Sequence, residues 1–306
     1  MIQILLATYN SAPFLEIQLD SLMNQSYRDF EILVNDGASR DNTLAIIADY
    51  QKRYPGKIHL LGSAPVSACK NFSILLAAAD AELIMFCDHD DVWKKEKIAV
   101  SLQAYRKMEQ QYGSELPILV FTDSEIVDAQ LKTCHPSMMR SQNLNRTHFT
   151  PGRTIIQNYA SGNTMLFNRA LQKIALPISD NAVMHDHWVA LAAAFFGKVC
   201  YVDKPLILYR QHGNNVLGSF HYDWSSYLKR FLTHGHSYRN RLHRIMEQGK
   251  SFLELHREIL SPEYLCLLNF LEHSKGMNKI SKWRFMLQHD ILKEGLLRNI
   301  GTFLLI

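Results

Sequence analysis

Hydrophobic residues occur along the chain in short runs, and stretches with helical spacing separate these runs. Each run is too short for a helix and predicts a buried β-strand, at residues 2–8, 30–34, 58–61, 83–87 and 118–122. Helical spacing follows at residues 14–23, from Asp41 or Asn42 to 54, at 68–79 and at 95–111. Strands that alternate with helices in this way indicate a mostly parallel sheet with right-handed crossovers. The pattern therefore predicts an α/β fold with a Rossmann-like sheet flanked by helices.

The second part of the pattern is less regular. Residues 124–151 are polar and irregular, and we interpret them as a flexible flap over a site. Strand character returns at residues 162–168, 199–201 and 206–209, with a short helix from Arg169 and a very apolar helix at 189–196.

Three carboxylates, Asp88, Asp90 and Asp91, follow the buried run at residues 83–87. They repel one another, and burying them at a strand end is costly unless a cation lies there. Open α/β sheets bind ligands just outside the carboxyl ends of their strands. The positions of an EF-hand loop are absent, and Val92 stands where an aspartyl phosphatase has Thr. The sequence Asp88-His89-Asp90 therefore predicts an Mg²⁺ or Mn²⁺ site that carries a phosphorylated ligand, with a solvated acidic turn as the alternative.

Polar residues also follow the first two strands. Thr8-Tyr9-Asn10 and Asp36 are expected at the same sheet edge, which suits a nucleotide. Asp36 can accept a hydrogen bond from the imide N–H of uracil or thymine, or it can form an ordinary turn. Lys70 opens the third helix, where a cation and free backbone N–H groups can meet a diphosphate. The alternative for Lys70 is a solvated surface lysine.

Further candidates lie in the second half of the chain. Asp186 stands between two histidines before an apolar helix, where it can be a helix cap or the base that takes a proton from an attacking hydroxyl. His212 can bind a metal through a neutral ring nitrogen, although a lone histidine after a strand is more often a plain surface or core residue. Trp93 and Trp188 offer apolar faces for a sugar ring, unless they belong to the core.

Length, leader and cysteine content narrow the class of protein. The chain has 306 residues with 47% apolar content, enough for one large domain or two. It begins with a strand pattern and no basic leader, and no segment approaches the roughly 18 apolar residues of a membrane span. Its five cysteines are widely spaced, which fits reduced thiols better than disulfides or a zinc site. We therefore expect a cytoplasmic protein.

The basic residues concentrate near the C-terminus. The net charge is +4, and residues 219–306 contain 13 Lys and Arg against eight Asp and Glu. Apolar residues there have helical spacing, with Lys and Arg interleaved; examples are Leu228, Phe231, Leu232, Arg239, Arg241, Arg244 and Trp283. This pattern fits helices on an anionic membrane surface. It fits equally a helical region whose apolar face packs on the catalytic core or on a second subunit.

Six motifs, taken in order, resemble family 2 glycosyltransferases with the GT-A fold, especially the bacterial rhamnosyltransferase-like branch. They are Ala7-Thr8-Tyr9-Asn10, Asn35-Asp36-Gly37-Ala38-Ser39-Arg40-Asp41-Asn42-Thr43, Phe86-Cys87-Asp88-His89-Asp90-Asp91-Val92-Trp93, Ser161-Gly162-Asn163, His185-Asp186-His187-Trp188 and Tyr209-Arg210-Gln211-His212-Gly213-Asn214-Asn215. Two departures affect the choice of nucleotide and sugar. Asn35 replaces the first Asp, and Ala38 the Ser, of the usual Asp-Asp-Gly-Ser, and His89 replaces the branch's usual Gln.

The resemblance implies an inverting transfer from a nucleotide-diphosphate sugar to a hydroxyl of a growing cell-surface glycan, such as O-antigen, capsule or cell-wall polysaccharide. It favours dTDP-L-rhamnose among dTDP- and UDP-linked donors. It implies a lipid-linked or oligosaccharide acceptor, and we expect no nucleic acid as a partner. Peripheral contact with the inner face of the plasma membrane is an expectation from the C-terminal helices. The implied units are a GT-A domain at 1–218, with a nucleotide-sugar half at 1–112 and an acceptor half at 113–218, and a helical region at 219–306.

The resemblance also distributes roles among the candidate residues. Asp186 would be the catalytic base, and Asp90, Asp88 and His212 would hold Mg²⁺ or Mn²⁺. The donor would contact Thr8, Tyr9, Asn10, Asp36, Lys70, Asp88 and His89. The acceptor or sugar would contact Trp93, Gly162, Asn163, His185 and Trp188.

Two other classes stay open. One is a nucleotide-sugar-binding protein without catalysis, which would have no need of Asp90, Asp186 and His212 together. The other is a nucleotidyltransferase or a metal-dependent phosphohydrolase on a similar sheet. A nucleotidyltransferase would carry a Gly-rich phosphate loop with Arg or Lys where this chain has Thr8-Tyr9-Asn10-Ser11.

Overall fold

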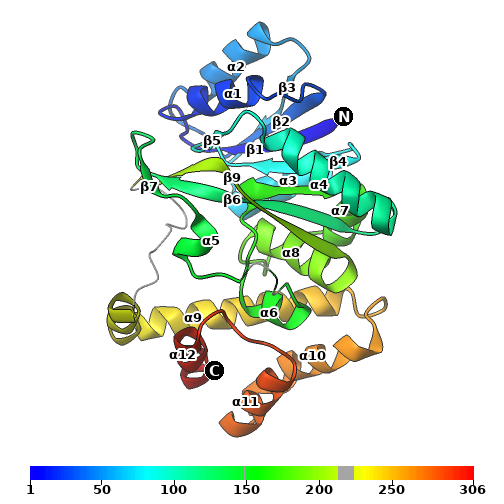
Figure 1. Ribbon diagram of the computed structural model, residues 1–306, viewed down its shortest axis with the longest axis vertical. Coiled ribbons are helices and arrows are strands. Elements are labelled where there is room, and N and C mark those ends of the chain that lie inside the picture. The colour runs from blue at the N-terminus through cyan, green and yellow to red at the C-terminus, as the bar shows by residue number, and fades with distance from the viewer. Residues whose placement is uncertain (146, 148, 213–223) are drawn as a thin grey trace.

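The computed structural model describes residues 1–145, 147, 149–212 and 224–306 (Figure 1). Nine strands in these residues form one sheet, in the order β3-β2-β1-β4-β8-β6-β9-β5, with β7 paired to β6. The strands are β1 (Ile2–Thr8), β2 (Phe30–Asp36), β3 (Ile58–Ser63), β4 (Leu83–Cys87), β5 (Val92–Trp93), β6 (Ile118–Val127), β7 (Thr133–His135), β8 (Met165–Asn168) and β9 (Lys198–Arg210). The helices are α1 (Leu15–Met23), α2 (Thr43–Arg53), α3 (Ala68–Ala78), α4 (Lys97–Tyr112), α5 (Met138–Ser141), α6 (Pro151–Ile156), α7 (Arg169–Ala175), α8 (His185–Phe196), α9 (Trp224–Leu255), α10 (Pro262–His273), α11 (Lys279–Gln288) and α12 (Leu296–Leu305). Two short 3-10 helices, η1 (Gly162–Thr164) and η2 (Ser274–Gly276), complete the elements.

The first four strands form the parallel half of the sheet. β1 pairs in parallel with β2 and with β4, and β2 pairs in parallel with β3. In this register Thr8 lies opposite Asp36, and Leu6 lies opposite Cys87. The carboxyl ends of β1, β2 and β4 therefore meet at one edge, as the sequence pattern predicts.

The other half of the sheet is mixed. β8 lies between β4 and β6 and is antiparallel to both, whereas β6 and β9 are parallel. The two short strands expected at 199–201 and 206–209 are one strand, β9, whose pairing with β6 shifts register around Asp123. The register shifts accommodate the polar residues between 201 and 206, which make this one strand look like two in the sequence.

The segment at 124–151 is not the irregular flap that its polarity suggests. Residues 124–127 continue β6, and they are followed by β7 and the short helix α5. Asp123 organises this segment, because its carboxylate accepts hydrogen bonds from the Ser137 hydroxyl and from the backbone N–H of Met139 (3.1 Å). The side chain of Met139 is buried in the core. The polar residues serve these internal contacts.

Helices cover both faces of the sheet (Figure 1). On one face Ile2, Ile4 and Leu6 pack with residues of α1, α2 and α4. On the other face Leu5 and Ala7 pack with residues of α3, α7 and α8. This alternation along β1 is the period of two expected for a strand buried on both sides. The predicted α/β fold, a Rossmann-like sheet between helical layers, is confirmed.

The helices α9 to α12 extend the core on the α8 side of the sheet. Figure 1 shows α9 running beneath α6 and α8, with α12 beside it. Phe252 in α9, Leu268 in α10 and Met286 in α11 are buried in the same core cluster as α8. The sequence expectation of a helical region packed on the catalytic core is met along this face. The proposed boundary at 218 and the side chains of Leu228, Phe231 and Leu232 lie outside the described residues.

An ion-pair cluster also holds this region to the catalytic part. Arg153 in α6 donates from Nε to Asp290 Oδ2 at 2.9 Å and from Nη1 to Glu294 Oε1 at 3.1 Å. Next to it, a side chain at Gly152 would collide with the His289 carbonyl. Glycine therefore permits a close approach of α6 to the chain after α11. Among the described helices, none is long and apolar enough to cross a bilayer.

Candidate active site

The ends of β1 and β2 are joined by a dense set of hydrogen bonds. The Gly37 N–H donates to the Thr8 carbonyl at 2.8 Å, and the Thr8 hydroxyl donates to Asp36 at 2.8 Å. Asp36 also accepts from Ser39 N (2.8 Å), Ser39 Oγ (2.6 Å) and Ser63 Oγ (2.7 Å). Burial raises the pKa of Asp36, but these hydrogen bonds outweigh it and hold the pKa below its ordinary value.

This geometry changes what a base contact at Asp36 requires. The carboxylate is buried, and four donors fill the roughly four acceptor positions of its two oxygens. A nucleobase could bond to Asp36 only by replacing one of these donors, such as the hydroxyl of Ser39. The contact between Asp36 and a base therefore stays a prediction.

Three other predicted donor residues lie nearer to solvent. Tyr9 is exposed, and the Asn10 amide oxygen accepts from Arg40 N at 2.9 Å, which ties the loops after β1 and β2 together. Lys70 lies in the first turn of α3, where Ser67 is the N-cap, and its Nζ is 3.8 Å from Asp180. Cation and helix N-terminus are thus adjacent, as the phosphate-binding hypothesis needs. Their contact with a donor stays a prediction.

The acidic cluster lies between β4 and β5, next to the end of β9. Asp90 Oδ2 lies 2.9 Å from His212 Nε2, and the imidazole of His212 stacks on the Phe14 ring, with centroids 4.5 Å apart. The sequence prediction that Asp90 and His212 belong to one site fits this geometry. Phe14 was not identified from the sequence, since an apolar residue at a helix start carries no chemical signal.

Asp88 is the third predicted metal ligand. Among the described His, Cys, Asp and Glu side chains, no three converge as a metal-binding group. The structure thus brings Asp90 and His212 together, and the assignment of Asp88 as a third ligand stays a prediction. Burial, together with the charges of Asp91, Asp90 and Asp186, raises the pKa of Asp88 well above its ordinary value. Asp88 thus lies within electrostatic range of both the cluster and Asp186.

Asp91 is the residue of the cluster to which the sequence assigned no separate role. It is buried, accepting from Arg210 N at 3.2 Å and from the Asn163 side-chain amide. Burial and the adjacent charge of Asp90 raise the pKa of Asp91 to about 8. Asp91 thus joins the start of β5 to β9 and to the turn η1, and it positions Asp90 beside it.

The turn η1 connects the two acidic parts of the site. The Gly162 N–H donates to Asp186 Oδ2 at 3.1 Å, and the next residue, Asn163, donates to Asp91. Both Gly162 and Asn163 are buried. Their expected role as sugar contacts is therefore corrected: they hold the two carboxylates in place. A side chain at position 162 would lie 2.9 Å from His185 Nε2, which explains glycine there.

Asp186 lies in the first turn of α8, and the residue is partly exposed. Its Oδ1 accepts from His187 N at 2.6 Å, and its Oδ2 accepts from Gly162 N. Burial raises the pKa of Asp186 to about 6, and the two backbone hydrogen bonds lower it in part. A carboxylate with a pKa near neutrality, fixed by backbone donors and reachable from solvent, has the properties of a general base.

The two tryptophans predicted to stack on a sugar belong to the core. Trp188 is fully buried, packs against Phe252, and donates from Nε1 to the Ala175 carbonyl at 2.9 Å. Trp93 lies in β5, which pairs with β9, and it is buried, with Lys97 Nζ 3.5 Å from its ring centroid. Neither ring face is open to a ligand. The stacking role is therefore wrong for both residues, because large apolar rings next to buried strands and helices fill the core.

His185 is also enclosed. Its ring stacks on Phe72 with centroids 3.8 Å apart and meets the edge of Phe86. Burial lowers the pKa of His185 to about 3, so the ring is neutral. The expected direct contact of His185 with a sugar is corrected to a packing role beneath Gly162 and Asp186.

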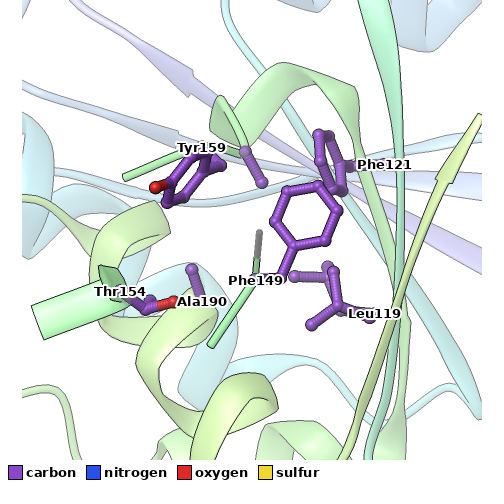
Figure 2. A pocket seen from close by; sticks show the side chains of 8 residues that line it. Leu119, Phe121, Phe149, Thr154, Tyr159 and Ala190 are labelled. Atoms are coloured by element: carbon purple, nitrogen blue, oxygen red, sulfur yellow. The ribbon is translucent and has the colours of Figure 1, made fainter. Parts of the chain in front are cut away.

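A small cavity near the site is too narrow to bind a substrate. Figure 2 shows Phe149 directed toward Leu119 and Phe121, with Tyr159 on the opposite side. The cavity measures about 10 Å³, close to the minimum volume for one water molecule. This cavity is therefore a packing defect. The candidate site is the edge of the sheet where Asp90, His212 and Asp186 lie.

The fold is shared with glycosyltransferases of known structure. TarS residues 1–349 from S. aureus, in complex with UDP-GlcNAc, superpose with a TM-score of 0.57 at 18% identity, over 82% of this chain and 66% of that one. The mannosyltransferase PcManGT from Pyrobaculum calidifontis, in complex with GDP-Man and Mn²⁺, gives a TM-score of 0.55 at 15% identity, over 99% and 86%. The chain thus has the GT-A glycosyltransferase fold.

Residues 3–175 match the model of glycosyl transferase family 2, and the chain belongs to this family. It is therefore a glycosyltransferase. The dTDP-rhamnosyl transferase RfbG of Shigella flexneri is 31% identical over 225 residues, which cover 70% of this chain and 74% of that protein. An uncharacterised glycosyltransferase of Nostoc is 26% identical over 220 residues, covering 70% and 66%. Membership of the family decides against the nucleotidyltransferase and phosphohydrolase alternatives.

Proposed function

We propose that the enzyme is an inverting transferase that moves L-rhamnose from dTDP-L-rhamnose to a hydroxyl of a growing cell-surface glycan. The observation that carries the reaction type is the turn η1, in which consecutive residues hold Asp186 and Asp91. A base and an acidic diphosphate site are thereby kept at a constant separation. The similarity to RfbG supports the choice of donor.

Asp186 takes the proton of the acceptor hydroxyl in this proposal. Its backbone hydrogen bonds orient the carboxylate, and its pKa of about 6 leaves it ionised at neutral pH. The acceptor oxygen then attacks the anomeric carbon while the bond from that carbon to the diphosphate breaks. The proton goes to Asp186, and the nucleoside diphosphate leaves with the electron pair.

The pair Asp90–His212 is suited to Mg²⁺ or Mn²⁺. A carboxylate oxygen and an imidazole nitrogen 2.9 Å apart are a compatible donor set for an ion that also takes water and substrate phosphate oxygens. When bound, such an ion would offset the negative charge that develops on the leaving diphosphate. Tyr9, Asn10, Asp36, Lys70 and His89 would surround the nucleotide and diphosphate at the edge formed by β1, β2 and β4.

The donor is tested with pure protein, Mn²⁺ and a panel of nucleotide sugars, including dTDP-L-rhamnose, UDP-L-rhamnose and UDP-GlcNAc. Release of nucleotide is followed with and without a rhamnose-containing oligosaccharide acceptor. We expect acceptor-dependent release of dTDP from dTDP-L-rhamnose above all others. Faster turnover of another donor would reject rhamnose but retain transfer, whereas no turnover with any donor and acceptor would count against the proposed chemistry.

A further inference from the structure

The C-terminal helix α12 exposes a stripe of apolar residues to solvent. Leu296, Ile300 and Leu304 follow one another at intervals of four residues and are 76%, 45% and 51% exposed. On the opposite side Gly301 and Thr302 are buried. An amphipathic helix on a soluble core normally buries its apolar stripe. Phe303 and Leu305 of α12, and Ile306 after it, pack against the core. The stripe of Leu296, Ile300 and Leu304 is a second apolar side, and it is available for a partner.

Polar contacts hold α12 in this orientation. Arg298 donates from Nη2 to the carbonyl of Gln142, the residue that follows α5, at 2.8 Å. The side chain of Asn299 bonds to the backbone of Lys293 in both directions, at 2.8 Å each. Rotating the helix to bury Leu296, Ile300 and Leu304 would break the bonds to Gln142 and Lys293. The outward direction of the apolar stripe is therefore built into the fold.

The neighbouring helix α11 continues the exposed apolar area. Trp283 Nε1 donates to the Phe303 carbonyl at 2.8 Å, and Lys279 Nζ donates to the Leu304 carbonyl at 3.3 Å, so the two helices are held together. Ile280 and Leu287, seven residues apart on α11, are 75% and 59% exposed. We call the exposed apolar residues of both helices, with the basic residues beside them, the α11–α12 surface. It consists of Ile280, Leu287, Leu296, Ile300, Leu304, Lys279, Lys282 and Arg284.

The charge around these apolar residues is positive. Lys279, Lys282 and Arg284 form no ion pair with a carboxylate among the described residues. The nearby acids Asp290 and Glu294 are both paired with Arg153. The surface thus combines aliphatic side chains with unneutralised cations.

We propose that the α11–α12 surface docks the enzyme on an anionic lipid bilayer. Aliphatic side chains with interleaved Lys and Arg are the composition of interfacial helices, and anionic headgroups complement the three cations. A second copy of the chain fits less well, because a twofold interface on this face would bring the basic residues of both copies together. The proposal goes beyond sugar transfer and does not depend on the identity of the donor.

The test is co-sedimentation of the full chain with phosphatidylcholine vesicles that contain or lack phosphatidylglycerol, without donor or acceptor. We expect binding to the anionic vesicles at low salt, and a roughly tenfold loss in the triple variant Leu296→Ser, Ile300→Ser, Leu304→Ser. Lys282→Glu with Arg284→Glu should lose binding as well. Ile259→Ser is the matched control, since Ile259 is 58% exposed but lies between α9 and α10.

The outcomes separate the proposal from its alternatives. Full-length protein that stays in the supernatant with anionic vesicles would overturn it, as would a triple variant that binds like the wild type. Sedimentation velocity is measured on the same samples without lipid. A wild-type dimer that dissociates in the triple variant would assign the surface to a second copy instead. Circular dichroism checks that each variant is folded. We expect the variants to fold, because the changed side chains are exposed.

Discussion

Nε2 of His212 lies 2.9 Å from Oδ2 of Asp90, although 122 residues separate them along the chain. Asp90 follows β4, and His212 follows β9, so the contact joins the two halves of the sheet. The ring of Phe14 stacks on the imidazole of His212. The fold thus brings two residues that are far apart in the sequence into one candidate metal-binding pair.

Asp90→Ala is expected to abolish sugar transfer and to weaken donor binding in Mn²⁺, because it removes the carboxylate of the pair. Calorimetric titration of the donor, with and without Mn²⁺, measures the loss, and circular dichroism shows whether the fold survives. His212→Ala is the companion variant and should weaken the same Mn²⁺-dependent part of binding. Wild-type turnover by Asp90→Ala in EDTA-treated buffer would contradict a metal role.

Asp186→Asn should lower the rate of transfer by on the order of 10²–10⁴-fold and leave donor binding intact. The amide keeps the shape of the side chain, and its one oxygen can still accept from Gly162 N or from His187 N, but it cannot take a proton. Initial rates and donor dissociation constants, measured side by side, distinguish the roles. An equal loss of binding and rate would make Asp186 structural instead.

The pH dependence of the rate should follow the ionisation of Asp186. Burial raises the pKa of this carboxyl to about 6, so its base form is lost as the pH falls through 6. We expect kcat to fall about tenfold per pH unit below that value and to level off above it. The residual rate of Asp186→Asn should lack this acidic limb. A wild-type profile that is flat from pH 5 to 7 would exclude Asp186 as the base.

Lys97→Met tests how a buried lysine near the acidic cluster affects the pH dependence of stability. Lys97 is fully buried without a hydrogen-bond partner, and burial lowers its pKa to about 7. Between this value and the ordinary pKa near 10.5, the unfolded chain binds more protons than the folded one, so stability rises with pH. Relative to the variant, the wild type should gain at most about 1.4 kcal/mol per pH unit in this window. Urea unfolding of both proteins at pH 7 and pH 9 measures the difference, and parallel curves would contradict the expectation.

Arg153→Met should loosen the attachment of the C-terminal helices. It removes the partner of Asp290 and Glu294, of which Glu294 is 12% exposed and Asp290 is 40% exposed. We expect a loss of about 2–3 kcal/mol in the free energy of unfolding, below the roughly 3–5 kcal/mol for a fully buried pair, because Asp290 reaches solvent. Lys250→Met, which removes a surface pair with Glu254, is the control and should cost less than about 0.5 kcal/mol. Equal losses in the two variants would show that α6 does not anchor the tail.

The hydrophobic pattern determined the order and type of most elements. The apolar runs at β1, β2 and β4 are buried on both faces. Such runs predict central strands of a sheet that helices cover on both sides. The position of Asp90 at the end of β4, and of Asp36 at the end of β2, follows directly. These features depend on local periodicity and on the rule that parallel strands end together, both of which are readable in the chain itself.

Other features depend on contacts that no local pattern encodes. The sequence offers Trp93, Trp188 and His185 as possible sugar contacts, but residues from distant segments enclose all three rings. Gly162 and Asn163 look like ligand contacts, and they bind Asp186 and Asp91 instead because η1 is packed between them. The exposure of a side chain is a property of the assembled molecule.

The C-terminal region shows the same division. Its helical spacing and its basic residues are visible in the sequence, which therefore determined that amphipathic helices form there. Which side of each helix faces the core was decided by tertiary bonds, such as the one from Arg298 to the Gln142 carbonyl, which turn the apolar stripe of α12 outward. Periodicity defines a stripe, but only the contacts of its opposite side fix the direction in which that stripe points.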